Sequence, residues 1–397
     1  MLRKNHKGGA AAVAIMVIIM IVAIASAVLI VTGRFSIKKS NVEQTVSPVQ
    51  SKPDQSSETI SESDLSSVAE PAPINLYPTL AADYQDVNIK GLTAGSSILV
   101  DADTNEIVAG FNYEKKIYPA SLTKILTLMV AVENIDDMSA TYTFTDDDID
   151  PLIEDNASMA GFEAGESVTM EDLLYASILV SGADGTIGLA NSIAGSEEAF
   201  VALMQQKLKD LGLDSTTNFV NASGLHNKNH YTTVQDIAVL TRAALESETC
   251  RKVLTASTYT TGKTEQHPDG IELTSIVASR FEGYFIDCDG DGEADSDVEI
   301  LGGKTGFTDE ALYTLSSVIE KGGHRYICVV ARSKSEFDSV EDAIAIYEKY
   351  LGPNKTKKTE LNIDTETEED TDDTENDTDT QKVDEGATVK VENDDAA

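Results

Sequence analysis

The sequence has few cysteines, histidines and positive charges, and it has no tryptophan. Its three cysteines, Cys250, Cys288 and Cys328, form an odd set without paired or metal-ligand spacing, which argues against a disulfide framework. Cys328 lies in the apolar run 326–331, so we expect a buried core thiol there. Lysine and arginine total 30 against 68 acidic residues, and the formal net charge is −38. Because nucleic-acid binding needs a basic surface, the sequence argues against a nucleic-acid partner.

Several catalytic signatures are also missing. The sequence has no G-x-S-x-G nucleophile elbow, no phosphate-binding P-loop and no dinucleotide-binding fingerprint. Its five histidines show no H-E-x-x-H spacing, which excludes a zinc peptidase of that type. His226 and His230 are four residues apart, but they lie in a loop rich in glycine and asparagine, and we expect them to be structural or solvated.

One long apolar run is present, from Ala10 to Val31, and it contains no charged residue. Its length of about 22 residues is enough to span a hydrocarbon core as a helix, and it exceeds the apolar core of a cleavable secretory signal. We therefore expect a cytoplasmic N-terminus at 1–9 and an uncleaved transmembrane anchor at 10–32. Alanines at 23, 25 and 27 leave cleavage open. Arginine and lysine flank the run on both sides, so the charges alone do not orient it.

Composition divides the rest of the chain into three parts. Residues 33–75 are rich in Ser, Glu, Gln, Asp and Pro and predict a disordered stalk. Residues 76–352 alternate strand-like and helix-like segments, which predicts one α+β domain. Residues 353–397 consist mostly of Thr, Asp and Glu and predict a disordered acidic tail. The expected strands are 96–101, 106–112, 311–320 and 324–331, and the expected helices are 119–133, 170–180, 196–211, 237–245 and 339–350.

The first chemical motif is Ser121-Leu-Thr-Lys124, at the predicted start of the helix 119–133. Residues three apart share one face of a helix, so the Ser121 hydroxyl and the Lys124 amine would point into the same cleft. A serine hydroxyl is a poor nucleophile until a base takes its proton. A lysine can be that base when desolvation or a second cation lowers its pKa. Alone, the motif also fits an ordinary helix start.

Two further segments complete a pattern. Ser181 opens a Ser-Gly-Ala segment after an apolar helix, and Lys304-Thr305-Gly306-Phe307 leads into a predicted strand. Small residues on such a strand let a substrate backbone lie alongside it. Lys304 would supply positive charge, and Thr305 would supply a hydroxyl, for a substrate carboxylate.

In this order the three segments resemble the S-x-x-K, S-x-N and K-T-G signature of penicillin-binding proteins and serine β-lactamases. The surrounding residues 118–127, 221–226, 231–238 and 303–311 look like those of the low-molecular-mass D-alanyl-D-alanine carboxypeptidases. The resemblance covers roughly residues 92–351. It implies a β-lactamase/penicillin-binding-protein-like transpeptidase domain of the α+β class, with an antiparallel sheet flanked by helices. The N-terminal transmembrane helix expected from the apolar run would precede this domain, whereas the family often carries its membrane anchor at the C-terminus.

The same resemblance implies a function. The chain would remove the terminal D-alanine from peptidoglycan stem pentapeptides and so regulate cross-linking. This chemistry places the catalytic domain outside the cytoplasm, and the apolar run at 10–32 then makes the chain a single-pass cell-membrane protein. Ser121 would be the acylated nucleophile and Lys124 its base. Ser181 would relay a proton between the lysines and the leaving amine. Such a mechanism requires no cofactor, and β-lactams would be covalent inhibitors because they mimic the substrate amide.

Substrate binding is assigned in the same way, as an implication of the resemblance. Lys304 and Thr305 would hold the terminal carboxylate of the substrate, with Gly306 and Phe307 on the same substrate-binding strand. The backbone N–H groups of Ser121 and Phe307 would form the oxyanion hole, whose donors are typically worth about 2.7–4 kcal/mol each in the transition state.

Ala183 departs from this pattern, because the family has asparagine there. An asparagine would offer an amide to the substrate carbonyl and to the lysines, and alanine offers neither. Two alternatives therefore stay open. One is a catalytically impaired homologue that binds the cell wall. The other is a serine β-lactamase, which would need a water-activating base that the sequence does not identify.

An acidic segment before Lys304 resembles a calcium loop. Asp287, Asp289, Asp291 and Asp295 occupy positions 1, 3, 5 and 9 of such a loop, with a glycine at position 6. Position 12 is valine, so the bidentate glutamate of a complete EF-hand is missing. The segment predicts either a structural Ca²⁺ site near the cleft or a solvated acidic hairpin tip.

Overall fold

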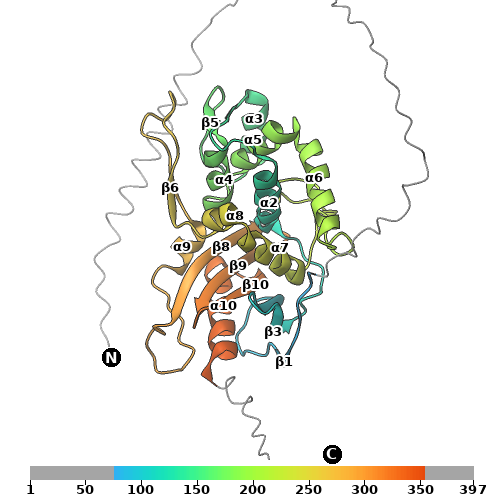
Figure 1. Ribbon diagram of the computed structural model, residues 1–397, viewed down its shortest axis with the longest axis vertical. Helices are drawn as coiled ribbons and strands as arrows, with labels where there is room; N and C mark the ends of the chain where they lie inside the picture. The colour runs from blue at the N-terminus through green and yellow to red at the C-terminus, as the bar shows by residue number, and fades with distance from the viewer. Residues whose placement is uncertain (1–75, 354–397) are drawn as a thin grey trace, which may run out of the picture. The chain divides into compact units, whose positions relative to one another are not determined.

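The computed structural model describes residues 76–353 (Figure 1). The predicted cytoplasmic terminus, membrane anchor and stalk lie outside the described residues, as does the acidic tail after residue 353, and all four stay predictions. Within residues 76–353, no helix has both the length and the apolar character needed to cross a membrane.

A six-stranded sheet forms the centre of the described part, in the order β1-β3-β2-β10-β9-β8. Neighbouring strands are antiparallel except β1 and β3, which pair in parallel, so the prediction of a wholly antiparallel sheet is wrong at this edge. β1 is exposed along most of its length, and its sequence therefore lacks the alternating apolar pattern from which a strand could be inferred. The strands of this sheet are β1 (Thr79–Asp86), β2 (Ser96–Asp101), β3 (Glu106–Phe111), β8 (Val298–Thr308), β9 (Leu312–Lys321) and β10 (His324–Ser333).

Two small two-stranded sheets and a set of helices complete the described part. The small sheets pair β4 (Thr141–Thr143) with β5 (Ser167–Thr169) and β6 (Thr258–Thr260) with β7 (Glu272–Thr274). The helices are η2 (Ala120–Thr123), α2 (Lys124–Asn134), α3 (Asp146–Glu154), α4 (Met170–Leu179), α5 (Ala183–Ala194), α6 (Glu197–Asp210), α7 (Val234–Glu246), α8 (Glu248–Leu254), α9 (Ile276–Phe281) and α10 (Glu336–Leu351).

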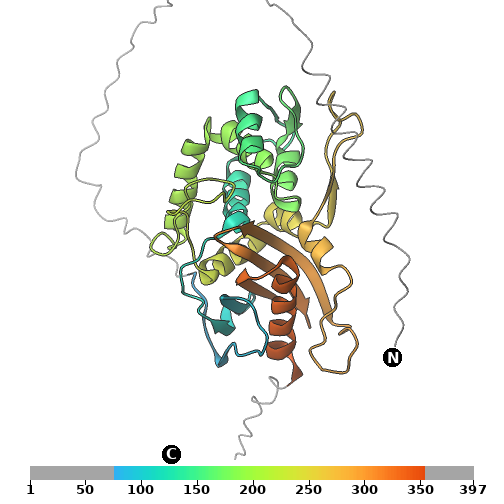
Figure 2. The same ribbon diagram turned by 180° about the vertical axis from the view of Figure 1, so that it is seen from behind.

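The sheet buries side chains on both faces, because successive residues of a strand point to opposite sides. On β10, Ile327 and Val329 pack toward the helices around α2, whereas Cys328 and Val330 pack toward α10. Cys328 is fully buried, which confirms the predicted core thiol. Figure 1 shows α7 crossing one face of the sheet, and Figure 2, the view from behind, shows α10 lying along the other.

The helical part is built around α2, whose residues from Lys124 to Ala131 are all buried. A helix that is buried on every side needs cover on every side, and α4, α5, α6, α7 and α8 supply it. The predicted helix 119–133 lies where it was expected, but only part of it is an α-helix. Its first turn is the 3-10 segment η2, and the α-helix begins only at Lys124. The serine and the lysine of the first motif therefore sit on either side of this change.

Helix α5 was not expected from the sequence, because its first turns contain Gly185 and Gly188. A Cβ at Gly185 would lie 2.8 Å from the Ser177 nitrogen, and one at Gly188 would lie 2.9 Å from Leu173. Gly185 thus lets α5 approach the α4 main chain, and Gly188 leaves room for the Leu173 side chain. Because glycine has a low helix propensity, the sequence pattern does not predict this helix. In the structure, the contact with α4 offsets the free-energy cost of placing glycine in a helix.

Candidate active site

The first motif lies at the junction of η2 and α2, beneath the end of β8. Lys124 Nζ donates a hydrogen bond to Ser121 Oγ at 3.2 Å and another to the main-chain oxygen of Ser223 at 2.6 Å. The structure therefore brings the predicted nucleophile and its predicted base into contact. Ser223 fixes the amine from the opposite side, a role that the sequence motifs did not identify.

The electrostatic setting makes Lys124 a base near neutral pH. Burial lowers the pKa of its ammonium from 10.5 to about 7, while the negative charges of Asp184 and Glu197 oppose this shift. Burial has this effect because a charged amine loses its hydration when it is enclosed by protein. An appreciable fraction of Lys124 is thus neutral at pH 7 and able to take the Ser121 proton.

The second and third motifs meet beside the first. Lys304 Nζ, on β8, donates hydrogen bonds to Ser181 Oγ and to the main-chain oxygen of Thr305, both at 2.9 Å. Burial lowers the pKa of Lys304 well below its usual value, and the nearby positive charges of Lys124 and Arg280 lower it further. Ser181 has a φ of 63°, in the left-handed region, at the turn between α4 and α5. This turn directs its hydroxyl toward Lys304.

Arg280, near the end of α9, is a cation that the motif search missed. Its Nη2 contacts a carboxylate oxygen of Glu336 at 3.3 Å, whereas its buried Nη1 has no hydrogen-bond partner among residues 76–353. The positive charges of Arg280 and Lys124 both act on Lys304, so Lys304 of the K-T-G motif lies near two other cationic side chains.

The close approach of β8 to η2 depends on Gly306. A Cβ at this position would lie 2.5 Å from Thr314 Oγ1 and 2.9 Å from the Ser121 nitrogen. Glycine therefore allows the β8 main chain to pass directly beside the Ser121 amide. This geometry agrees with the prediction that Ser121 and Phe307 supply the oxyanion-hole amides, which itself stays a prediction. The Phe307 ring is partly exposed and packs on Tyr313 at 4.5 Å.

The three motifs surround a cleft of about 450 Å³. Ser121, Lys124, Ser181 and Phe307 lie on its wall, whereas Lys304 and Thr305 are buried behind it. The lining residues are Ser121, Lys124, Asp155, Asn156, Ala157, Ser158, Ser181, Ala183, Ser223, Gly224, Leu225, Phe307, Thr308 and Asp309.

Ala183, the departure from the family pattern, lines this cleft and its amide donates to the Ser158 oxygen at 2.7 Å. The next residue, Asp184, is fully buried, and its carboxylate accepts hydrogen bonds from the amides of Ala160, Gly161 and Gly185. Asp184 thus tethers the segment that forms one wall of the cleft. Only its position beside the second motif could have drawn attention to it.

The acidic loop lies away from this cleft. It precedes β8 at Val298, whereas the nucleophile meets β8 at Gly306, and eight residues of extended strand span roughly 27 Å. The expectation of a calcium site near the cleft is therefore wrong in its placement. Three of the four predicted ligands come together, since carboxylate oxygens of Asp287, Asp289 and Asp295 lie within 4.8 Å of one another.

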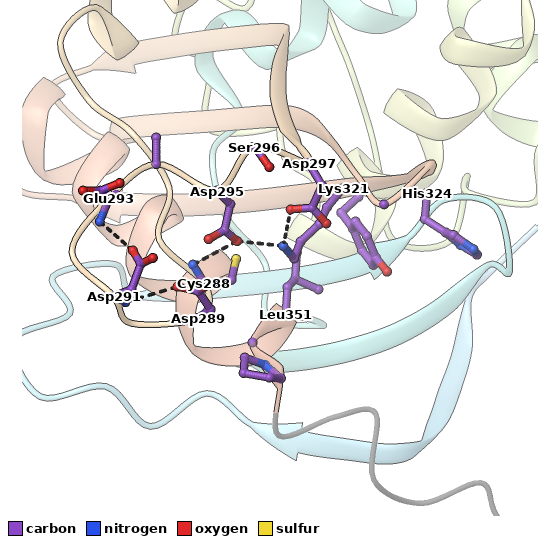
Figure 3. Close-up of a pocket in the computed structure, with 15 residues that line it drawn as sticks. Cys288, Asp289, Asp291, Glu293, Asp295, Ser296, Asp297, Lys321, His324 and Leu351 are labelled. Atoms are coloured by element: carbon purple, nitrogen blue, oxygen red, sulfur yellow. Dashed lines mark hydrogen bonds and ion pairs between the residues drawn. The ribbon is translucent and has the colours of Figure 1, made fainter.

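Asp291 does not join this group, because its carboxylate accepts the Glu293 amide at 2.8 Å. Lys321 Nζ binds Asp295 at 2.7 Å and Asp297 at 2.9 Å (Figure 3). An ammonium group thus already neutralises part of the loop. The hollow of about 740 Å³ beside the loop is larger than the catalytic cleft but contains none of the S-x-x-K or K-T-G side chains.

Comparisons with known proteins agree with the geometry. D-alanyl-D-alanine carboxypeptidase DacF of Bacillus subtilis is 31% identical over 242 residues, covering 60% of this chain and 57% of the relative. DacD of Salmonella typhimurium is 30% identical over 284 residues, covering 68% of this chain and 66% of the relative. The chain thus spans about three fifths of the length of these curated relatives.

Solved structures show the same fold. The crystal structure of the Streptomyces K15 DD-transpeptidase superposes with a TM-score of 0.56 at 25% identity, covering 66% of this chain and 99% of that one. The sequence profile of the D-alanyl-D-alanine carboxypeptidase family, Peptidase_S11, matches residues 83–335. This match includes all three motifs and most of the described fold. The chain belongs to the D-alanyl-D-alanine carboxypeptidase family of serine peptidases.

Proposed function

We propose that this chain is a serine D-alanyl-D-alanine carboxypeptidase that removes the terminal D-alanine of peptidoglycan stem peptides through an acyl-enzyme. The observation that carries the proposal is the contact of Lys124 Nζ with Ser121 Oγ, at 3.2 Å, by an amine whose pKa is lowered to about 7. A weak nucleophile and a base of matched pKa are the two groups that this acyl transfer needs. The curated relatives bear the same activity in their names.

The reaction follows from these positions. Neutral Lys124 takes the Ser121 proton while Oγ attacks the carbonyl carbon between the two D-alanines. The resulting oxyanion collapses, the C–N bond breaks, and the leaving amine receives a proton through Ser181. Water then attacks the ester carbonyl, with Lys124 as base, and Ser121 is regenerated when its oxygen takes the proton back.

Substrate binding would depend on the positively charged side chains around the K-T-G motif. Lys304 and Thr305 would hold the terminal carboxylate, with the charge of Arg280 behind them. An arriving carboxylate favours the charged form of Lys304 and opposes the lowering of its pKa by burial. Binding of the carboxylate should therefore raise the pKa of Lys304 back toward its usual value. It is also coupled to Ser181, whose hydroxyl accepts from the same ammonium.

The direct test is mass spectrometry of the intact protein after exposure to penicillin. We expect one adduct, located on the peptide that contains Ser121, and loss of the adduct in Ser121→Ala with an unchanged melting temperature. An adduct elsewhere, or none on folded protein, would remove the catalytic assignment and favour the wall-binding alternative raised by Ala183.

A second measurement separates the carboxypeptidase from a β-lactamase. The proposal expects D-alanine release from a D-Ala-D-Ala peptide and slow turnover of the penicillin adduct. Rapid, repeated penicillin hydrolysis without D-alanine release would instead support the β-lactamase.

We further propose that residues 10–32 anchor the chain in the cell membrane, with the catalytic domain outside the cytoplasm. The charge-free apolar run from Ala10 to Val31 supports this, as does a substrate that lies outside the cytoplasm. Added protease should digest the domain in intact protoplasts. A mature protein that begins near residue 28 would contradict the anchor, and protection from the protease would contradict the outside location.

A further inference from the structure

Ala120, the residue immediately before the nucleophile, has a left-handed backbone. Its φ is 49°, a conformation in which the alanine Cβ crowds the following carbonyl. Such a residue persists only where its surroundings hold it. Because its peptide leads directly into Ser121, whatever holds Ala120 also sets the direction of the Ser121 amide and hydroxyl.

A buried chain of hydrogen bonds ends on the Ala120 carbonyl. Thr123 Oγ1 donates to Ala120 O at 2.9 Å and is itself 2.7 Å from His230 Nε2. The amide of Val220 donates to the other ring nitrogen, Nδ1, at 3.1 Å. Since Nδ1 accepts, Nε2 carries the proton and donates to Thr123, whose own proton is then free for Ala120. Both ends of the chain thus require the same tautomer of the ring.

The ring is suited to this fixed role. His230 is 1% exposed and stacks on Phe219 with a centroid distance of 4.8 Å. Burial lowers the pKa of His230 to about 3, and the positive charge of Lys124 adds to this effect. The ring therefore stays neutral at physiological pH and is not a proton donor or acceptor for the substrate.

The loop that carries His230 contacts both the residue before the nucleophile and the base. A Cβ at Gly224 would lie 2.0 Å from the Ala120 oxygen, so the loop main chain presses directly on that carbonyl. The neighbouring Ser223 oxygen accepts from Lys124 Nζ at 2.6 Å. The loop residues 219–230 therefore fix two groups of the first motif from outside the motif itself.

We propose that His230 is a positioning residue for acylation, which acts through Thr123 to hold the left-handed Ala120 peptide and thereby aim Ser121. This inference rests on the proposed function, because it concerns the rate at which Ser121 is acylated. It also assigns a purpose to Thr123, the threonine inside the first motif, which is fully buried and does not line the catalytic cleft.

Thr123 offers a matched pair of variants. Thr123→Val keeps the shape of the side chain but loses the hydroxyl, whereas Thr123→Ser keeps the hydroxyl. We expect the second-order rate constant for penicillin acylation to fall about tenfold or more in Thr123→Val, because small misplacements of a nucleophile are costly. Thr123→Ser should remain close to the wild type. With a D-Ala-D-Ala peptide, kcat/KM should fall by a similar factor in Thr123→Val and not in Thr123→Ser, because this ratio reports the acylation step.

His230 offers a second pair. The amide of His230→Gln can reach Thr123 from the position of Nε2, whereas the shorter His230→Asn can satisfy only Val220. Glutamine should therefore restore acylation that asparagine loses, in proteins of similar melting temperature. If His230→Asn does not fold, the Thr123 pair decides the matter alone.

Four results separate the outcomes. Equal acylation rates in Thr123→Val and the wild type, or equal losses in Thr123→Val and Thr123→Ser, would overturn the positioning role while leaving the proposed function intact. A folded His230→Gln no faster than a folded His230→Asn would also overturn it. Absence of a Ser121 adduct in the wild type would instead defeat the proposed function, and the positioning role with it.

Discussion

The lowered pKa of Lys124 predicts the pH dependence of acylation. A fall from 10.5 to about 7 corresponds to about 5 kcal/mol of preference for the neutral amine over the ammonium. At pH 7 about half of the lysine would then be neutral, against roughly one part in 3,000 for an unperturbed amine. Lys124 must be neutral to act as the base. The acylation rate should therefore reach its maximum above the Lys124 pKa and fall about tenfold per pH unit below it.

Substitution of Glu197 tests this pH dependence, because it changes the Lys124 pKa without changing Lys124 itself. The Glu197 charge raises the Lys124 pKa, and its Oε1 accepts the Ala222 amide at 2.9 Å. Glu197→Gln removes the charge but retains an oxygen for that bond. The Lys124 pKa should therefore fall, and the acid limb of the rate profile should move to lower pH.

The assay is the second-order rate constant for acylation by a fluorescent penicillin, measured from pH 5 to pH 9. Glu198→Gln is the matched control, because Glu198 lies exposed on the same helix and its charge does not shift the Lys124 pKa. A wild-type profile that is flat over this range, or that rises only above pH 9, would refute the reasoning. So would a limb that moves to higher pH in Glu197→Gln.

Three further predictions concern other parts of the molecule. Gly306→Ala should slow acylation at least about tenfold, because its Cβ would lie 2.9 Å from the Ser121 nitrogen and must displace β8 from the cleft; penicillin labelling measures this, and an unchanged rate would contradict it. Truncation after Gly352 should leave the acylation rate and the melting temperature nearly unchanged, whereas a loss of several degrees would show that the tail docks on the domain. Millimolar calcium should raise the melting temperature, with weak affinity of about 10⁻⁴–10⁻³ M, and Asp289→Ala with Asp291→Ala should erase the increment. Because Lys321 already neutralises Asp295 at 2.7 Å, no shift with calcium would show that this ammonium is sufficient.

Local spacing was enough to predict the part of the site that lies within one helical turn. Ser121 and Lys124 are three residues apart, and a helical turn of either kind brings them together. The strand β8, which carries the K-T-G residues, was not among the strands expected from the sequence pattern, and only the resemblance placed these residues in the site. The helices α4, α6, α7 and α10 were predicted within a few residues, because their apolar spacing is regular and their first turns carry threonine or serine caps.

The remaining features depend on contacts between distant segments. The left-handed Ala120 is imposed by Thr123 and by Gly224, which lies more than one hundred residues away in the chain. His230 was expected to be structural or solvated, and the structure makes it structural, but its link to the first motif has no sequence signature. The burial of Asp184 and the parallel pairing of β1 are likewise tertiary properties.

The glycine contact between α4 and α5 determines which wall of the cleft can be redesigned. Gly182 and Gly185 leave no space for a side chain at this junction, so the two helices behave as a single rigid part with Ser181 at their corner. Substitutions within either helix therefore have little scope to widen the cleft without breaking the corner. The opposite is true of residues 155–158, which line the cleft and are largely exposed. Changes in substrate preference, by engineering or by natural divergence, should accumulate in this short segment and spare the glycines.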